Sequence, residues 1–207
     1  RIRGAELVAN PGCYPTGILL GLAPLYGAGV MDTGRPVMID AASGVTGAGR
    51  SARRDLLFGE VAEDYRAYGV GNTHRHVPEI ARGLAAAAGG AVPFVFTPHL
   101  LPVRRGILET MYVPVQRDRS AADVVASWNE AYGSEPFVEV WAEGLPSLQT
   151  SVGRNVVALG ASDVAGLEMP MVVVVASFDN LVKGAAGQAL QNANLMLGLC
   201  EREGLTA

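Results

Sequence analysis

The feature that most constrains the fold of this sequence is a series of short segments rich in β-branched and aromatic residues. Segments of this composition, bounded by turn residues, are typical of β-strands. None of them approaches the roughly 18 to 20 apolar residues that a membrane-spanning helix needs. The strands that we expect lie at residues 37–42, 92–97, 107–115, 137–141, 156–159 and 171–178, with a further short one at 6–9. Strands of similar length and composition predict one large sheet.

Helix signals lie between and after these strands. The turn Asn10-Pro11-Gly12 precedes an apolar run, Pro78 and Gly89 bracket a segment with one apolar face, and Ser120 with Asp123 resembles a capping box. Asp179 can cap a last helix. The expected helices are residues 13–28, 77–88, 121–132 and 179–200. We therefore expect an α+β fold, with a large mixed, mostly antiparallel sheet and helices on one face.

Charge and composition limit the partners. The chain has 207 residues, 49% of them hydrophobic, and a formal net charge of -4. It lacks the concentrated positive charge that nucleic-acid binding requires, so we expect a small-molecule substrate, no nucleic acid and no membrane. With only two cysteines, a reducing cytoplasm is the expected location. The sequence begins with neither Met nor a signal-like core, so we expect further residues ahead of it.

Cys13 is the strongest candidate for a catalytic residue. It directly follows a Pro-Gly turn at the expected start of a helix. Unpaired backbone N–H groups and the helix dipole at such a position favour the thiolate, which is the nucleophilic form of cysteine. The competing interpretation is a buried, inert cysteine, which is common for a free thiol.

Two histidines, His74 and His76, are candidates for a general acid and base. In an extended segment, residues two apart face the same way, so both rings could point into one cavity. We prefer His74, with His76 close behind. The spacing also resembles a metal-ligand pair, but only Glu79 follows as a further ligand, so we expect no metal. We expect His99 to be structural.

A small-residue loop at 43–52 could bind an anion. Ser43 and Gly44 could present a hydroxyl and a backbone N–H, and Arg50 could add charge. A glycine-rich loop is more often only a tight bend. The loop by itself does not decide between these alternatives.

Several longer strings together resemble one family. They are NPGCYPTG at 10–17, SGVTGAGRSA at 43–52, HRHVPEI at 74–80, FTPHLLPVRRGILET at 96–110 and DNLVKGAAGQALQNANLM at 179–196. The chain resembles the N-acetyl-gamma-glutamyl-phosphate reductase family of arginine biosynthesis, over nearly its whole length. The resemblance implies a fold similar to the catalytic domain of the glyceraldehyde-phosphate and semialdehyde dehydrogenases. It also implies NADPH-dependent reduction of an acyl phosphate to a semialdehyde through a cysteine thioester.

The resemblance assigns further residues. Cys13 inherits the nucleophile's role, Arg105 and Glu79 become substrate-binding candidates, and Asn180 and Gly17 become cofactor-binding candidates. Glu79 could instead orient a histidine or cap its helix, and Asn180 could be an ordinary cap.

No Gly-rich dinucleotide fingerprint is present, so we expect the nucleotide-binding half to precede this chain and NADP to bind mainly there. Residues 1–178 would then be a catalytic and dimerisation domain, and residues 179–207 a helix that packs on the absent half. We expect this fragment alone to be inactive and the enzyme to be a homodimer or homotetramer.

The sequence is also compatible with other functions. An aspartate-semialdehyde dehydrogenase shares the chemistry, but the strings at 10–17 and 74–80 fit it less well. A cysteine acyltransferase or hydrolase would use the same Cys and His pair without a redox step. The chain could also be simply an oligomerisation module. Phosphate release coupled to a hydride donor distinguishes the reductase from the others.

Overall fold

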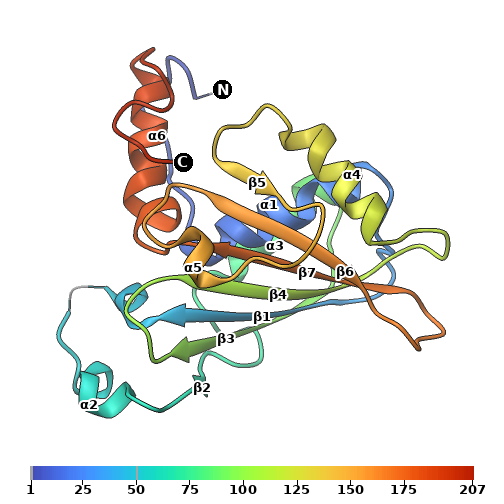
Figure 1. The fold of residues 1–207 in the computed structure, drawn as a ribbon, viewed down its shortest axis with the longest axis horizontal. Coiled ribbons are helices and arrows are strands. Elements are labelled where there is room, and N and C mark those ends of the chain that lie inside the picture. The colour runs from blue at the N-terminus through green and yellow to red at the C-terminus, as the bar shows by residue number, and fades with distance from the viewer. Residues whose placement is uncertain (1, 50) are drawn as a thin grey trace.

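A computed structural model describes residues 2–49 and 51–207, and a seven-stranded sheet dominates this described part (Figure 1). The strand order across the sheet is β2-β3-β1-β4-β7-β6-β5. The strands are β1 (Val37–Gly44), β2 (Arg66–Ala67), β3 (Phe94–Leu101), β4 (Ile107–Pro114), β5 (Val138–Val140), β6 (Val157–Asp163) and β7 (Met171–Phe178).

The pairing in this sheet is mixed and mostly antiparallel, as predicted. β1 with β3 and β5 with β6 are the parallel pairs, and the remaining neighbours are antiparallel. β1 and β3 can run parallel because α3 (Val77–Ala88) lies between them in the chain and supplies a helical crossover. β4 then returns along the other edge of β1, which places β1 and β4 near the centre of the sheet.

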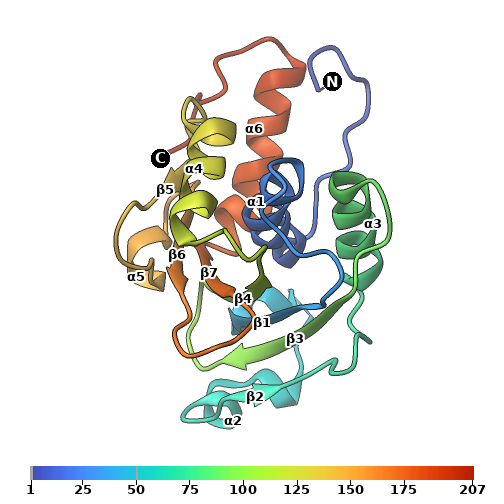
Figure 2. The ribbon, with the colours of Figure 1, turned by 90° about the vertical axis from the view of Figure 1, so that its right-hand side faces the viewer.

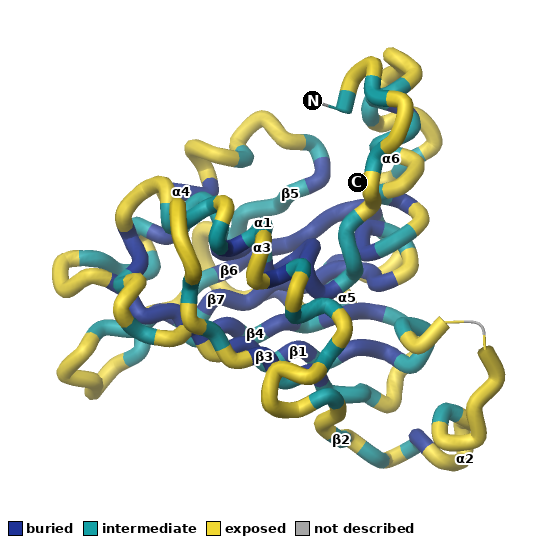
Figure 3. The backbone as a smooth tube through the Cα atoms, turned by 180° about the vertical axis from the view of Figure 1, so that it is seen from behind, coloured by how far each residue is buried: buried dark blue, intermediate teal, exposed yellow. Residues whose placement is uncertain are grey.

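The longer helices cover one face of this sheet, also as predicted. α1 (Cys13–Gly27) packs on β4 and β7, with α3 and α4 (Ala121–Tyr132) on either side of it. Figure 2 shows these three helices on the same side of the strands, and Figure 3 shows α1 and α3 in front of the sheet when it is seen from behind. α6 (Gly187–Met196) stands at one end of the sheet (Figure 1). The remaining helical segments are η1 (Val45–Ala48), η2 (Arg54–Leu56), α2 (Phe58–Val61), α5 (Leu148–Ser151) and the π-helical turn η3 (Val182–Ala186).

The hydrophobic core fills the space between α1 and the sheet. Ile18 and Leu22 of α1 are fully buried, as are Met111 of β4 and Val174 of β7. Trp128 of α4 donates its indole N–H to a backbone carbonyl of α1, at 2.8 Å. Such a bond satisfies the one polar atom of a buried tryptophan and fixes α4 against α1.

The expected strand at residues 6–9 is wrong, because these residues form no strand, and Asn10 instead donates from its side chain to the carbonyl of Ala185. The expected cap of the last helix is confirmed, since the Asp179 carboxylate accepts the N–H groups of Leu181 and Val182. The helical segment itself runs from Val182 to Met196 and so is shorter at both ends than expected. The helices expected at 13–28, 77–88 and 121–132 are confirmed within one residue. Among the described helices, none has both the length and the apolar character needed to cross a membrane.

Candidate active site

Cys13 is the first residue of α1, and two other elements fix the turn before it. Both carboxylate oxygens of Glu79, in the first turn of α3, accept the backbone N–H of Gly12, at 3.1 and 3.3 Å. The ring of His76 lies against the Cα of Gly12, so closely that an added Cβ would be 2.7 Å from Nε2. A glycine is therefore required at this position, and the start of α1 is held against the beginning of α3.

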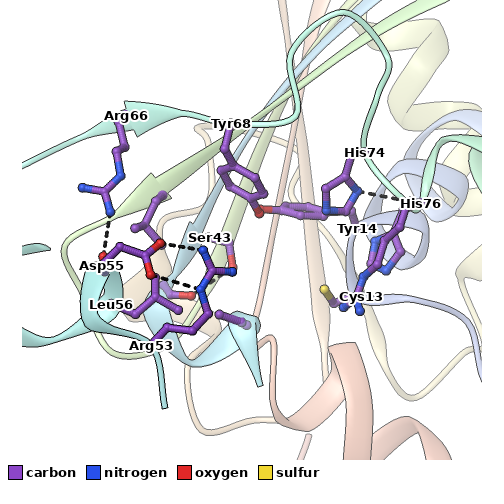
Figure 4. Close-up of a pocket in the computed structure, with 15 residues that line it drawn as sticks. Cys13, Tyr14, Ser43, Arg53, Asp55, Leu56, Arg66, Tyr68, His74 and His76 are labelled. Carbon is purple, nitrogen blue, oxygen red and sulfur yellow. Dashed lines mark hydrogen bonds and ion pairs between the residues drawn. The ribbon is translucent and has the colours of Figure 1, made fainter. Parts of the chain in front are cut away.

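One cavity of about 340 Å³ brings most of the predicted site residues together. Cys13, Ser43, Gly44, His74 and His76 all line it. Figure 4 shows Cys13 beside the two histidines, with the Tyr14 and Tyr68 side chains next to them. Residues 74–76 form a turn and not the extended segment that we expected, but both rings still reach the same cavity.

The two histidines are held differently. His74 accepts the backbone N–H of His76 at its Nδ1, at 3.1 Å, so a neutral His74 carries its proton on Nε2. The Nδ1 of His76 is buried and has no partner among the described residues. The rings stand nearly perpendicular, with centroids 4.8 Å apart.

The site keeps both imidazoles uncharged at neutral pH. Burial, followed by the charge of Arg75, lowers the pKa of His74. Burial, then His74 and Arg75, lowers the pKa of His76 to about 4. Both rings can therefore act as neutral hydrogen-bonding groups, and a cation forms there only at a considerable energetic cost.

The resting state of Cys13 differs from the expected thiolate. Burial raises the pKa of Cys13 to about 11, although backbone hydrogen bonds at the helix start act in the opposite direction. Removal from water outweighs the helix terminus because a thiolate loses most of its hydration here. Cys13 is therefore a thiol at rest, and it needs a base when it attacks.

The loop after β1 forms the wall opposite α1. Ser43 is almost fully buried at the end of β1, and the Gly44 N–H donates to the carbonyl of Gly106. A Cβ on Gly44 would lie 2.8 Å from the backbone nitrogen of Arg105, so glycine permits this close approach of two chain segments. Arg50, the charged residue predicted for this loop, lies outside the described residues.

Four other predicted residues lie next to the cavity but do not line it. The Glu79 carboxylate is bound to Gly12, and the Arg105 guanidinium forms an ion pair with the buried Asp179, at 2.8 Å. Asn180 accepts the Gly106 N–H at 2.7 Å and donates to the Thr46 hydroxyl at 3.0 Å. The Cα of Gly17 faces the sheet, where Glu109 and Phe178 lie. The contacts of Glu79, Arg105 and Asn180 hold neighbouring chain segments in place.

Sequence reasoning missed several lining residues. The hydroxyls of Tyr14 and Tyr68 are 2.7 Å apart across the cavity, and Arg53, Asp55 and Arg66 line its far end. Tyr14 directly follows Cys13, so its position next to the predicted nucleophile could have indicated that it lines the site. The others lie in a segment with no periodic pattern.

No group of three or more His, Cys, Asp or Glu side chains suited to a metal ion occurs in the described ranges. Both Cys13 and Cys200 are free thiols.

Curated relatives match almost the whole chain. A protein from Geobacter sp. (strain M21), named N-acetyl-gamma-glutamyl-phosphate reductase, is 50% identical over 99% of this chain and 58% of its own length. Proteins of the same name from Pelobacter propionicus and Symbiobacterium thermophilum are 48% and 47% identical over the same share of the chain. The chain thus spans about three fifths of the length of these relatives.

Solved structures show the same fold. Aspartate semialdehyde dehydrogenase II from Vibrio cholerae superposes with a TM-score of 0.70 at 19% identity, over 92% of this chain and 62% of that one. A probable aspartate-semialdehyde dehydrogenase from Pseudomonas aeruginosa has a TM-score of 0.69, with the same identity and coverage. The family model described as semialdehyde dehydrogenase, dimerisation domain, matches residues 13–180. The mixed sheet, the helix that starts at the cysteine and this match agree: the chain belongs to the semialdehyde dehydrogenase dimerisation-domain family.

Proposed function

We propose that this chain is the catalytic part of an N-acetyl-gamma-glutamyl-phosphate reductase, which reduces an acyl phosphate to a semialdehyde with NADPH through a thioester on Cys13. The observation that carries the proposal is a cavity in which a cysteine thiol at a helix start lies with two neutral imidazoles. Relatives at 47–50% identity bear this name, which supports the acetylated glutamyl substrate over an aspartyl one.

The chain's own residues supply the acylation step. The Cys13 sulfur attacks the carbonyl carbon, the bond from that carbon to the phosphate oxygen breaks, and phosphate leaves. The thiol proton must go to a base as the carbon–sulfur bond forms, because a pKa of about 11 prevents its earlier release. A thioester is a better hydride acceptor than a carboxylate, so this covalent step prepares the reduction.

We assign the base role to His76 and a donor role to His74. The Nε2 of His76 lies against the turn that carries Cys13, whereas the lone pair on the His74 Nδ1 is already used by the His76 N–H. His74 then presents its Nε2–H, which can donate to the carbonyl oxygen as negative charge develops there. The order of preference between the two histidines is thus the reverse of the one drawn from sequence.

The two residues assigned to the cofactor from sequence have contacts within the chain: Asn180 bonds to Gly106 and Thr46, and the Cα of Gly17 faces the sheet. We therefore propose that NADP binds mainly to a nucleotide domain in the rest of the full-length protein. In this proposal residues 179–207 pack on that domain, and the chain alone is inactive.

We further propose a homodimer that works in the reducing cytoplasm. The matched family is described as a dimerisation domain, and the two free cysteines suit a reducing compartment.

The proposal is tested by phosphate-dependent oxidation of N-acetyl-glutamate semialdehyde with NADP, using the full-length protein. Cys13→Ser should abolish turnover, and Cys200→Ser, which changes the other, exposed thiol, should leave it unchanged. His76→Asn should lower kcat by about 10²- to 10⁴-fold, as for a general base. His74→Asn should lower it by about 10²-fold or more, as for a lost oxyanion donor.

Two results would contradict this assignment. Activity in Cys13→Ser would remove the thioester route altogether. Phosphate release from the acyl phosphate without NADPH oxidation would instead indicate a cysteine hydrolase or acyltransferase.

A further inference from the structure

The cavity has a second polar end, opposite the catalytic residues. Figure 4 shows Cys13, His74 and His76 at one end and Arg53, Asp55 and Arg66 at the other. The paired hydroxyls of Tyr14 and Tyr68 lie between the two groups. A ligand that fills this cavity therefore meets two different polar environments, one at each end.

An exposed ion pair occupies the second end. The Arg53 guanidinium forms a two-point contact with Asp55, from Nε to Oδ1 at 3.0 Å and from Nη2 to Oδ2 at 2.5 Å. The side chains are 59% and 54% exposed, so water and salt screen their attraction strongly. A pair of this kind opens at little cost, and another carboxylate can take the place of Asp55.

Arg66 supports this pair from the sheet. It donates from Nη2 to the backbone carbonyl of Asp55 at 2.8 Å, and it forms an ion pair with Asp64. Strand β2 holds Arg66 against β3, opposite Leu100. The segment that carries Arg53 is thereby tied to the sheet and not left as a free loop.

The charge of the lining favours an anion. Among the described lining residues, Arg53, Arg66 and Arg75 are cationic and Asp55 is anionic. The substrate class proposed above is anionic at two places. Its phosphate is bonded to the carbon that Cys13 attacks, so the phosphate must lie at the catalytic end. Its free α-carboxylate is four carbon–carbon bonds away from that carbon.

We propose that Arg53 binds the α-carboxylate of the substrate, and that Asp55 holds the guanidinium in place until the substrate displaces it. A planar guanidinium matches a carboxylate with two parallel hydrogen bonds, which is the contact that Arg53 already makes with Asp55. This inference rests on the proposed function for the identity of the ligand. It makes Arg53 and Asp55 the residues that select an acyl group bearing a second acid.

The test is a comparison of two probes by isothermal titration calorimetry on the full-length protein. N-acetyl-L-glutamate carries the α-carboxylate, and its α-carboxamide differs only in that group. The acid should bind at least about tenfold more tightly than the amide. Arg53→Gln should abolish this preference, and Asp55→Asn, which removes the competing carboxylate, should tighten binding of the acid by about three- to tenfold.

Arg54→Gln is the matched control, because Arg54 is the neighbouring arginine and does not line the cavity. It should leave the preference for the acid unchanged. Equal binding of acid and amide by the wild-type protein would overturn the inference. An equal loss of the preference for the acid in Arg54→Gln and Arg53→Gln would also overturn it, because it would indicate a non-specific effect of positive charge.

A separate measurement distinguishes this inference from the proposed function. Turnover of the full-length Cys13→Ser variant with NADP reports the thioester route alone. Full turnover in that variant together with an Arg53-dependent preference would count against the reductase and retain the carboxylate site. Abolished turnover without the preference would support the reductase and overturn the carboxylate site.

Discussion

At the scale of single residues, Glu109 is the least expected group in the chain. It lies on the central strand β4, is fully buried, and neither carboxylate oxygen has a hydrogen-bond partner among the described residues. Burial raises the pKa of Glu109 well above its ordinary value of 4.5. The carboxyl group therefore keeps its proton to a higher pH than a free glutamate does, and its negative charge, once formed, raises the pKa of the neighbouring Cys13.

Glu109→Gln should change how stability depends on pH. Below about pH 4.5 the carboxyl is protonated in both the folded and the unfolded chain, so it contributes no pH-dependent term there. Above that pH the unfolded chain ionises and the folded chain resists ionisation, so the wild type loses stability as pH rises. Gln does not titrate and should escape this loss. The free energy of unfolding in urea should be similar for both at pH 4 and about 1 to 3 kcal/mol higher for the variant at pH 8.

Glu168→Gln serves as the control, because Glu168 is exposed. It should show no such divergence between the two pH values. If Glu109→Gln followed the wild type at both pH values, Glu109 would have to be ionised and solvated in the folded protein, contrary to its burial.

At the scale of elements, the distance between α1 and the sheet depends on a glycine. A Cβ on Gly17 would overlap the Glu109 carboxylate and the Phe178 ring. Gly17→Ala should therefore destabilise the fold by about 1 to 3 kcal/mol, as overpacking of a core does, even though alanine favours a helix. Thermal unfolding measures this change in stability.

Gly27→Ala is the matched control for this prediction. Gly27 ends the same helix and has no atom within 4 Å of an added Cβ. It should be neutral or slightly stabilising. A second variant, Gly17→Ala with Glu109→Ala, should recover part of the lost stability, because the shorter side chain leaves room for the methyl group. If stability were not recovered, Phe178 and not Glu109 would be the side chain that limits how closely α1 approaches the sheet.

Elements with local signals could be predicted from the sequence, and elements defined by their partners could not. α3 was predicted to the residue, since Pro78 lies in its first turn and Gly89 ends it in a left-handed conformation. Residues 6–9 were predicted as a strand on composition, but no sheet edge pairs with them. The two residues of β2 have no strand pattern and form a strand only because they pair with β3.

The candidate site divides in the same way. Cys13 directly follows a Pro-Gly turn, and the two histidines lie two residues apart. These local signals allowed all three residues, which line the cavity, to be named from the sequence. Arg53 and Tyr68 reach the cavity only because the segment from 53 to 68 folds across the end of the sheet, and this depends on contacts with β3. No pattern within that segment indicates these contacts.

At the scale of the whole molecule, the face of the sheet opposite α1 and α3 carries no long helix from the described part of the chain (Figures 1 and 3). Met38, Val95 and Tyr112 are neighbours on it, since Met38 pairs with the other two across β1, β3 and β4. Met38 and Val95 remain 37% and 43% exposed. Tyr65 stacks on His99 of the same face, with ring centroids 5.0 Å apart. An apolar sheet face of this kind suits a second copy of the chain, in agreement with the dimerisation domain that it matches.

Val95→Arg should therefore weaken self-association. Across a two-fold axis the same substitution occurs on both copies, so a dimer through this face would bury two unpaired guanidinium groups. Burying an uncompensated charge costs about 3 to 5 kcal/mol, and at about 1.4 kcal/mol per tenfold the dimer Kd should rise at least about a hundredfold. Sedimentation equilibrium at micromolar concentration should show a dimer for the wild type and a monomer for Val95→Arg. Leu197→Arg changes an apolar position beyond α6 that is 74% exposed, and this variant should stay dimeric because Leu197 lies away from this face. A dimer that survives Val95→Arg but not Leu197→Arg would move the interface from the sheet to the end of the molecule where α6 stands.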